Sequence, residues 1–173
     1  MTLPTSGRPV GGSAFLEAMR VLPVGVVMVT VSVEGRPWGL TVSSCTSLTA
    51  DPPQILVSLG TRTVTCREIG ASGTFGVSVL AADHLAVAMA GAAAGRPKFV
   101  DGYCDEPERG SASPRVRGSV YHLDCRSVGV HEHADHSIVI GAVTRALAPP
   151  DGPGEPLIYF DRAFRRVGEH IHP

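Results

Sequence analysis

The chain has 173 residues, 43% of them hydrophobic, and a formal net charge of −1 at pH 7. A chain of this length can bury about two-thirds of its unfolded surface, which predicts a single domain with one core. The near-zero charge and the scattered basic residues leave no patch able to neutralise several phosphates, so we expect neither nucleic acid nor membrane as a partner.

Cysteine spacing and the first residues bear on the compartment. The cysteines at positions 45, 66, 104 and 125 form no C-x-x-C pair, and the chain is too large to depend on disulfides, so we expect reduced thiols in a cytoplasm. The first residues, MTLPTSGRPVGGS, contain no apolar run and do not resemble a signal peptide. We expect a flexible arm over 1–12, a single domain over 13–168 and a tail over 169–173.

The first element expected along the chain is a helix over 14–22. Ser13 is predicted to be its N-cap, apolar residues follow at helical spacing, and Pro23 ends it. The longest apolar stretch, 21–33, is interrupted by Pro23 and Gly25 and is far shorter than the roughly 20 residues that a membrane helix needs. We therefore expect a soluble protein.

β-branched residues dominate the next segment, VGVVMVTVSV at 24–33, which predicts one buried strand. An EGRP turn at 34–37 leads back through WGLTVSS, so these two segments are expected to form a hairpin. Further strands are predicted at 54–60, 74–80, 120–130, 137–147 and 156–160, with short helices at about 64–71 and 83–94. So many strands with so few helices between them favour an antiparallel barrel over a doubly wound parallel sheet.

Small hydroxyl side chains are concentrated at 41–49, where six of nine residues are Ser or Thr. Such residues are common in turns and at strand edges, because their side chains bond to nearby backbone. They also bind phosphate together with backbone N–H groups. A second hydroxyl set, TRTVT at 61–65, opens a predicted helix and adds Arg62, which favours phosphate binding. No G-x-G-x-x-G motif is present, so a bound nucleotide would not use a Rossmann fold.

Three histidines, His131, His133 and His136, lie within six positions. His131 and His133 would share a strand face, which is tolerable spacing for two metal ligands, but no H-E-x-x-H motif or Cys/His quartet supports a zinc site. The alternatives are a solvated loop and a histidine that faces a substrate. His136 is the strongest candidate for the latter, because it directly precedes the apolar strand SIVIG.

Six consecutive segments carry a resemblance to a known family. They are VGVVMVTV, WGLTVSSCTSLTADPPQILVSL, TRTVTCREIGASGTFGVSVLAADH, KFVDG, HADHSIVIGAV and EPLIYFDRAFRRV, and they extend over nearly all of residues 15–167. Their order resembles the flavin reductase family, the small reductase components of two-component flavin-dependent monooxygenases. The resemblance implies an FMN-binding split β-barrel that is mainly β and antiparallel, with a few short helices.

The activity that this resemblance implies is NAD(P)H:flavin oxidoreduction. The protein would reduce FMN or FAD with NADH or NADPH and supply reduced flavin to a separate monooxygenase, as a cytoplasmic homodimer. Hydride transfer is then the chemistry of the two nucleotides, and the protein supplies binding and orientation. The alternatives are a flavoprotein oxidase similar to pyridoxamine-phosphate oxidase, a non-catalytic flavin or haem carrier, and a barrel without a ligand.

The resemblance also implies site residues. Asp135 and His136 match an Asp-His pair on the nicotinamide side and are the catalytic candidates; no metal is implied. Cys45 stands where an aromatic residue is common in the family, and Ala142 where a glutamate often follows the glycine. The implied cofactor-binding residues are Gly39, Leu40, Thr41, Val42, Ser43, Ser44, Cys45, Thr46, Ser47, Ser58, Gly60, Arg62, Thr63, Thr65, Lys98, Phe99 and Tyr159.

Overall fold

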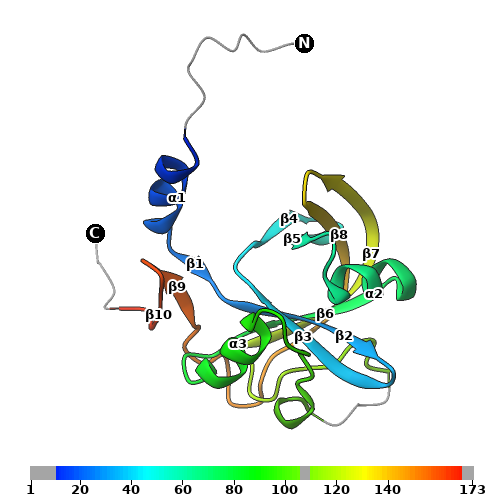
Figure 1. Ribbon diagram of the computed structural model, residues 1–173. Helices are drawn as coiled ribbons and strands as arrows, with labels where there is room; N and C mark the ends of the chain where they lie inside the picture. The colour runs from blue at the N-terminus through cyan, green and yellow to red at the C-terminus, as the bar shows by residue number, and fades with distance from the viewer. Residues whose placement is uncertain (1–10, 106–109, 169–173) are drawn as a thin grey trace.

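The computed structural model describes residues 11–105 and 110–168, which form mainly antiparallel β-sheet with short helices (Figure 1). The predicted arm and tail, 1–10 and 169–173, lie outside the described residues. The helices are α1 (Gly12–Arg20), α2 (Val64–Ser72), α3 (Leu85–Ala92) and the 3-10 helix η1 (Asp101–Tyr103). The strands are β1 (Val24–Gly25), β2 (Val27–Val33), β3 (Arg36–Val42), β4 (Cys45–Ala50), β5 (Pro53–Gly60), β6 (Thr74–Val79), β7 (Tyr121–His133), β8 (His136–Leu147), β9 (Ile158–Phe160) and β10 (Ala163–Arg165).

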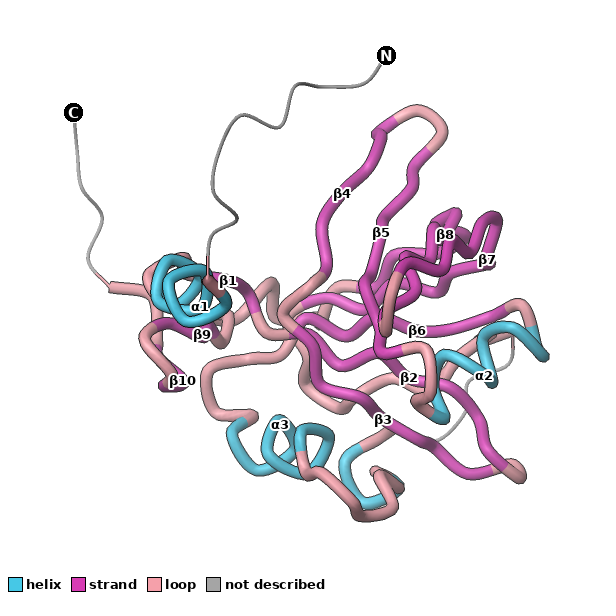
Figure 2. The backbone as a smooth tube through the Cα atoms, turned by 45° about the horizontal axis from the view of Figure 1, so that its top comes forward, coloured by secondary structure: helices cyan, strands magenta, loops and turns pink. Residues whose placement is uncertain are grey.

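Seven strands form the main sheet in the order β3-β2-β6-β7-β8-β5-β4, and every neighbouring pair is antiparallel. A small second sheet has the order β1-β9-β10. The prediction of a mainly β, antiparallel fold with a few short helices is confirmed. The hydroxyl tract itself supplies β4, an edge strand that was not predicted as a separate element. The β4–β5 hairpin reaches away from the rest of the sheet (Figure 2).

The β2–β3 hairpin confirms the EGRP turn. Glu34 and Gly35 both have positive φ, 52° and 77°, as a two-residue hairpin loop with the twist of its strands requires. The prediction of one continuous strand over 24–33 is wrong. Val24 and Gly25 pair with β9, whereas β2 begins at Val27 in the main sheet. An uninterrupted run of β-branched residues does not reveal that the chain changes sheets within it.

The ends of α2 follow the sequence closely. Thr63 is its N-cap, with a side chain that accepts from the Cys66 N–H, and Gly73 ends it in the left-handed conformation at φ 71°. The predicted N-cap of α1 is wrong, because the helix already begins at Gly12 with Gly11 as the capping residue. Gly is tolerated there, so Ser13 falls inside the first turn.

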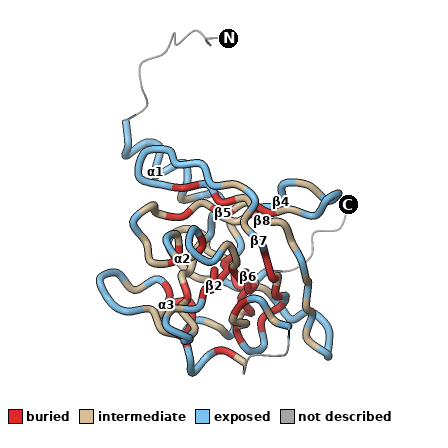
Figure 3. The backbone as a smooth tube through the Cα atoms, turned by 90° about the vertical axis from the view of Figure 1, so that its right-hand side faces the viewer, coloured by how far each residue is buried: buried red, intermediate tan, exposed pale blue. Residues whose placement is uncertain are grey.

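Two groups of buried side chains make up the core. Val29, Val57 and Phe75 belong to the larger group, which lies between the main-sheet strands and α2. Met28, Leu80 and Val87 belong to the second, under α3. Residues 27–31 of β2 are all buried, because this strand contributes side chains to both groups. Figure 3 shows the buried chain concentrated around β2 and β6 and α1 exposed along its length.

The cysteines and the helices test two further expectations. Cys45, Cys66, Cys104 and Cys125 are all free thiols, as expected. Burial raises the pKa of Cys45 to about 11, and burial together with Cys45 and Asp124 raises that of Cys125 to about 12. In the part of the chain that is described, no helix is both long and apolar enough to cross a membrane.

Candidate functional site

The predicted Asp-His pair lies beside the start of α2. Gly60, the last residue of β5, is paired with His136, the first residue of β8. The Thr61 N–H donates to the Asp135 carbonyl oxygen at 3.0 Å, and the Thr61 and Ser137 hydroxyls are 3.2 Å apart. The tight β7–β8 turn, with Ala134 at φ 53°, therefore places the pair against the segment that opens the helix.

Asp135 and His136 are bonded to each other. The Asp135 Oδ1 and His136 Nδ1 atoms are 2.8 Å apart, and the side chains are 83% and 55% exposed. This hydrogen bond, followed by the charges of His136 and Arg62, lowers the pKa of Asp135. An ionised carboxylate only accepts, so Nδ1 carries a proton, and whenever the ring holds a single proton Nε2 is an exposed acceptor. The pair can therefore present one acceptor nitrogen to a ligand.

The second hydroxyl set forms the first turn of α2. The Thr63 hydroxyl is occupied as the N-cap, since it donates to the Gly60 carbonyl at 2.8 Å and accepts from Cys66 N–H at 3.2 Å. Thr65 is fully buried and its hydroxyl has no partner, so a surface ligand cannot contact this side chain in the observed conformation. Exposed Arg62 and the unused N–H groups of the first turn are the groups left for an anion.

The end of β3 lines a pocket. Thr41, Val42 and Ser43 line a cavity of about 450 Å³ together with Tyr159 of β9, which is one of the cofactor-binding residues implied by the resemblance. The Thr41 hydroxyl donates to the Ala88 carbonyl at 2.8 Å and so ties the end of β3 to α3. The other lining residues are Val26, Met89, Ala92, Arg162 and Phe164. No sequence signal identified these five, because they come from elements that are distant along the chain.

The hydroxyls of β4 lie on the edge strand. The Ser44 hydroxyl donates to the Ser58 carbonyl at 2.6 Å, and the Ser58 N–H donates to the Ser44 carbonyl at 3.0 Å. These two predicted cofactor-binding residues therefore bond to each other and join the start of β4 to β5. Thr46 and Ser47 are exposed and make no hydrogen bond with their side chains among the described residues. Cys45 is half-buried against the larger core group. Free hydroxyls are thus available at Thr46 and Ser47.

Lys98 and Phe99, two of the cofactor-binding residues implied by the resemblance, contact other parts of the protein. Lys98 Nζ donates to the carbonyls of Gly91 and Ala93 at 2.7 and 2.6 Å, at the end of α3, and burial lowers its pKa. The Phe99 ring packs edge-on against Trp38, with centroids 5.0 Å apart. Gly39 is buried and lies against the backbone of Lys98, since the Gly39 N–H donates to the Lys98 carbonyl at 3.0 Å. Leu40 packs against the larger core group.

The histidine cluster is in strands and not in a loop. His133 is paired with His136 across the β7–β8 hairpin, and His131 with Ile138. Within residues 11–105 and 110–168, no group of three His, Cys, Asp or Glu side chains could hold a metal ion.

Comparison with known proteins identifies the family. The family model described as a flavin reductase like domain matches residues 19–168. A flavin reductase (NADH) of Kitasatospora aureofaciens is 32% identical over 169 residues, which cover 96% of this chain and 88% of that protein. The reductase component of a 4-nitrophenol 4-monooxygenase/4-nitrocatechol 2-monooxygenase of Rhodococcus opacus is 31% identical over 157 residues, with 91% and 82% covered.

A solved structure agrees with this assignment. The NADH:FAD oxidoreductase of Streptomyces globisporus, in complex with NAD and FAD fragments, superimposes with a TM-score of 0.80 at 30% identity, covering 94% of this chain and 98% of that one. The fold expected from the resemblance is therefore confirmed. The chain belongs to the flavin reductase like domain family.

Proposed function

We propose that this protein is an NADH-dependent flavin reductase that passes reduced FMN or FAD to a separate oxygenase. The structural observation that supports it most is the pairing of Gly60 with His136, which brings a nicotinamide-side candidate next to the anion-binding end of α2. The relatives support the same assignment, since one is named an NADH flavin reductase and another a monooxygenase reductase component.

The residues of the site fit a flavin. A pocket of about 450 Å³ with Tyr159 and Phe164 can receive part of a planar ring system, and Arg162 adds a cation at its rim. Ser47, Thr46 and the first turn of α2 offer free hydroxyl and N–H donors of the kind that bind phosphate. Lys98 and Thr41 hold α3 in place behind this pocket, so we assign them to positioning the wall.

When bound, the flavin supplies the acceptor for hydride, and the protein has to orient the donor. His136 Nε2, left exposed by the bond between Nδ1 and Asp135, suits the role of accepting from the nicotinamide carboxamide. Asp135 fixes the ring orientation and tautomer. Both groups are exposed, so this is a binding and orienting pair.

We also propose that two copies of the chain associate. Exposed apolar side chains are present on β4 and on the β7–β8 hairpin, where Leu48 is 47% exposed, Val130 45% and Ile138 40%. A second copy would cover these side chains and the free edge of β4. Light scattering should give the dimer mass. Ile138→Lys should shift it towards the monomer, and Leu85→Lys, at an exposed residue of α3, should not. A monomer mass for the unaltered protein would refute this proposal.

We take residues 13–168 to form one domain and the protein to act in the cytoplasm, in keeping with its four free thiols. The function is tested by titrating purified protein with FMN and FAD by fluorescence and then dialysing it. A reductase that uses flavin as a substrate should release the flavin on dialysis. Retention of one flavin per chain, with no turnover of NADH or NADPH, would instead support the carrier alternative.

A further inference from the structure

His122 of β7 is the one fully buried histidine in the described chain, and it is bonded on both ring nitrogens. Its Nδ1 atom is 2.9 Å from the Ser78 hydroxyl of β6, and its Nε2 atom is 3.1 Å from the Ser113 hydroxyl. Neither serine belongs to the candidate flavin site, so this hydrogen-bonded group is separate from the proposed function. Buried polar groups joined in this way hold a structure in one arrangement.

The directions of these hydrogen bonds can be assigned from their outer partners. The Val116 N–H donates to the Ser78 oxygen at 3.1 Å, which leaves the Ser78 O–H free to donate to Nδ1. The Ser113 O–H donates to Asp124 Oδ1, so the Ser113 oxygen accepts from Nε2–H. Every donor then has an acceptor only if His122 is neutral and carries its proton on Nε2.

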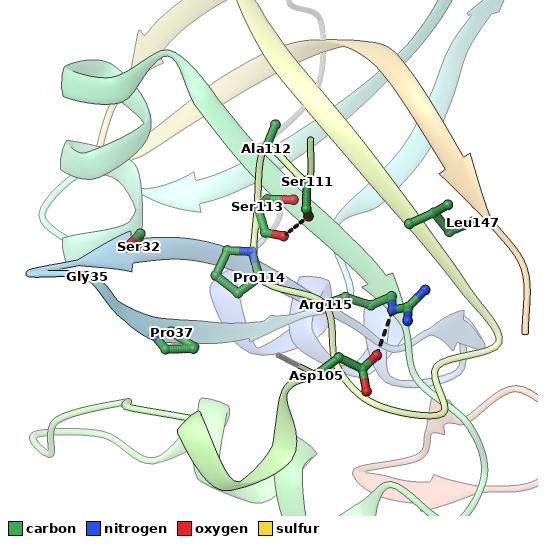
Figure 4. Close-up of a pocket in the computed structure, with 10 residues that line it drawn as sticks. All are labelled: Ser32, Gly35, Pro37, Asp105, Ser111, Ala112, Ser113, Pro114, Arg115 and Leu147. Atoms are coloured by element: carbon green, nitrogen blue, oxygen red, sulfur yellow. Dashed lines mark hydrogen bonds and ion pairs between the residues drawn. The ribbon is translucent and has the colours of Figure 1, made fainter. Parts of the chain in front are cut away.

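This chain of bonds holds the segment 113–116 against the sheet. Ser113 and Val116 are attached through His122 and Ser78, and the Pro114 carbonyl accepts from the Thr30 hydroxyl at 2.5 Å. Gly76 permits the close approach, since a Cβ there would lie 2.5 Å from Ser113 Oγ and 2.6 Å from His122 Cε1. Figure 4 shows Ser113, Pro114 and Arg115 of this segment lining a pocket of about 210 Å³, opposite Gly35 and Pro37.

We propose that neutral His122 is a pH-sensitive latch that keeps residues 113–116 on the sheet, and that a second proton on its ring releases them and opens this pocket. A proton on Nδ1 would point at Ser78 Oγ, which already accepts from Val116 N–H, and would force the Ser78 O–H to turn away from the ring. The Ser78 oxygen has two lone pairs and can accept both bonds, but its own buried O–H is then left without an acceptor among the described residues, which weakens the attachment of the segment.

The charged groups around the ring set the direction of the response. Burial is the largest influence and lowers the pKa of His122; Asp124 of β7 opposes this, and Arg115 and Arg145 of β8 add to it. His122 therefore binds the second proton more readily when residues 113–116 are released and its ring is exposed than when they are latched. The latch is fully stable above the ordinary histidine pKa of about 6.5 and weakens as pH falls from there towards the lower folded value.

Two measurements on the intact protein test the latch. Long-range ¹H–¹⁵N spectra at about pH 7.5 should show His122 protonated on Nε2 and not on Nδ1. Hydrogen-exchange protection of the Val116 amide should fall about tenfold or more between about pH 7.5 and pH 5, whereas the Val139 amide inside β8 should stay protected. In His122→Gln, whose amide can donate to one serine and accept from the other, this pH dependence should disappear.

His131→Gln is the matched control, because His131 is an exposed histidine on the same strand, and it should behave as the unaltered protein does. An Nδ1–H tautomer would overturn the proposal. So would unchanged Val116 protection at low pH, or a parallel loss at Val139, which would mean global unfolding. If His122→Gln does not fold, the tautomer and the titration of the unaltered protein still decide the matter.

Discussion

The Thr61 N–H donates to the carbonyl oxygen of Asp135 at 3.0 Å, which joins the start of α2 to the β7–β8 turn. Thr61 follows the last residue of β5, and Asp135 is bonded in turn to His136. The histidine proposed to orient the nicotinamide and the helix end proposed to bind phosphate are therefore held together by main-chain contacts. A substitution of the His136 side chain should leave this connection intact, so the two halves of the site can be tested separately.

His136→Ala should slow reduction of the flavin and raise the nicotinamide KM. It should leave flavin affinity within about threefold, a change of well under 1 kcal/mol. The reason is that Nε2 is assigned to the nicotinamide and not to the flavin. Stopped-flow reduction measures the first effect and flavin fluorescence the second. His133→Ala, on the residue paired with His136, is the control, and an unaltered reduction rate in His136→Ala would remove that residue from the mechanism.

Ser47→Ala should weaken flavin binding by roughly 1 to 3 kcal/mol, the range for loss of a hydrogen bond to a charged group. The Ser47 side chain is exposed on β4 and makes no hydrogen bond within the described protein, so folding should be unaffected. Fluorescence titration with FMN and FAD measures the loss. Ser32→Ala, an exposed serine at the other pocket, is the control. Equal affinity in both variants would place the phosphate elsewhere.

Lys98→Met should lower the free energy of unfolding by about 1 to 3 kcal/mol, because two carbonyls at the end of α3 lose their charged donor. Flavin affinity should change by less than about threefold if Lys98 acts only by holding α3. Urea denaturation and flavin titration measure the two effects. Exposed Arg96→Met is the control. A large loss of affinity without loss of stability would instead make Lys98 a direct flavin contact.

Two glycine substitutions should have opposite effects on stability. Gly91→Ala would put a Cβ 2.4 Å from Thr41 Oγ1 and 2.8 Å from Met28 Cε, so we expect a loss of about 1 to 3 kcal/mol. Gly70→Ala, at an exposed position of α2, meets nothing within 4 Å and should gain about 0.5 to 1 kcal/mol through helix propensity. Thermal or urea unfolding compares them, and a neutral Gly91→Ala would mean that α3 can move away from β3.

Local signals in the sequence were sufficient where a few neighbouring residues decide the structure. The EGRP turn and the start of a helix near Val64 were predictable for this reason, since turns and helix starts depend on residues close in the chain. The change of sheet at Val26 was not, because it depends on pairing with β9, more than 130 positions later.

The candidate site shows the same division. Thr41 and His136 could be singled out from hydroxyl-rich and histidine-rich segments, but the wall formed by Met89, Arg162 and Phe164 exists only after α3 and the small sheet have packed together. The hydrogen bonds that Lys98 makes within the protein could not be predicted either, because its partners are backbone carbonyls, which carry no sequence signature. The sequence therefore predicted which residue types belong to the site, but not which of their side chains make no hydrogen bond within the protein and can contact a ligand.

The proposed function requires that free flavin is a substrate of this protein. The most direct measurement follows nicotinamide absorbance with purified protein and NADH, before and after FMN or FAD is added. We predict no oxidation without flavin, and oxidation that begins on its addition and saturates with flavin concentration. Absence of flavin-dependent oxidation of NADH and NADPH, with both flavins, would rule out the proposed function.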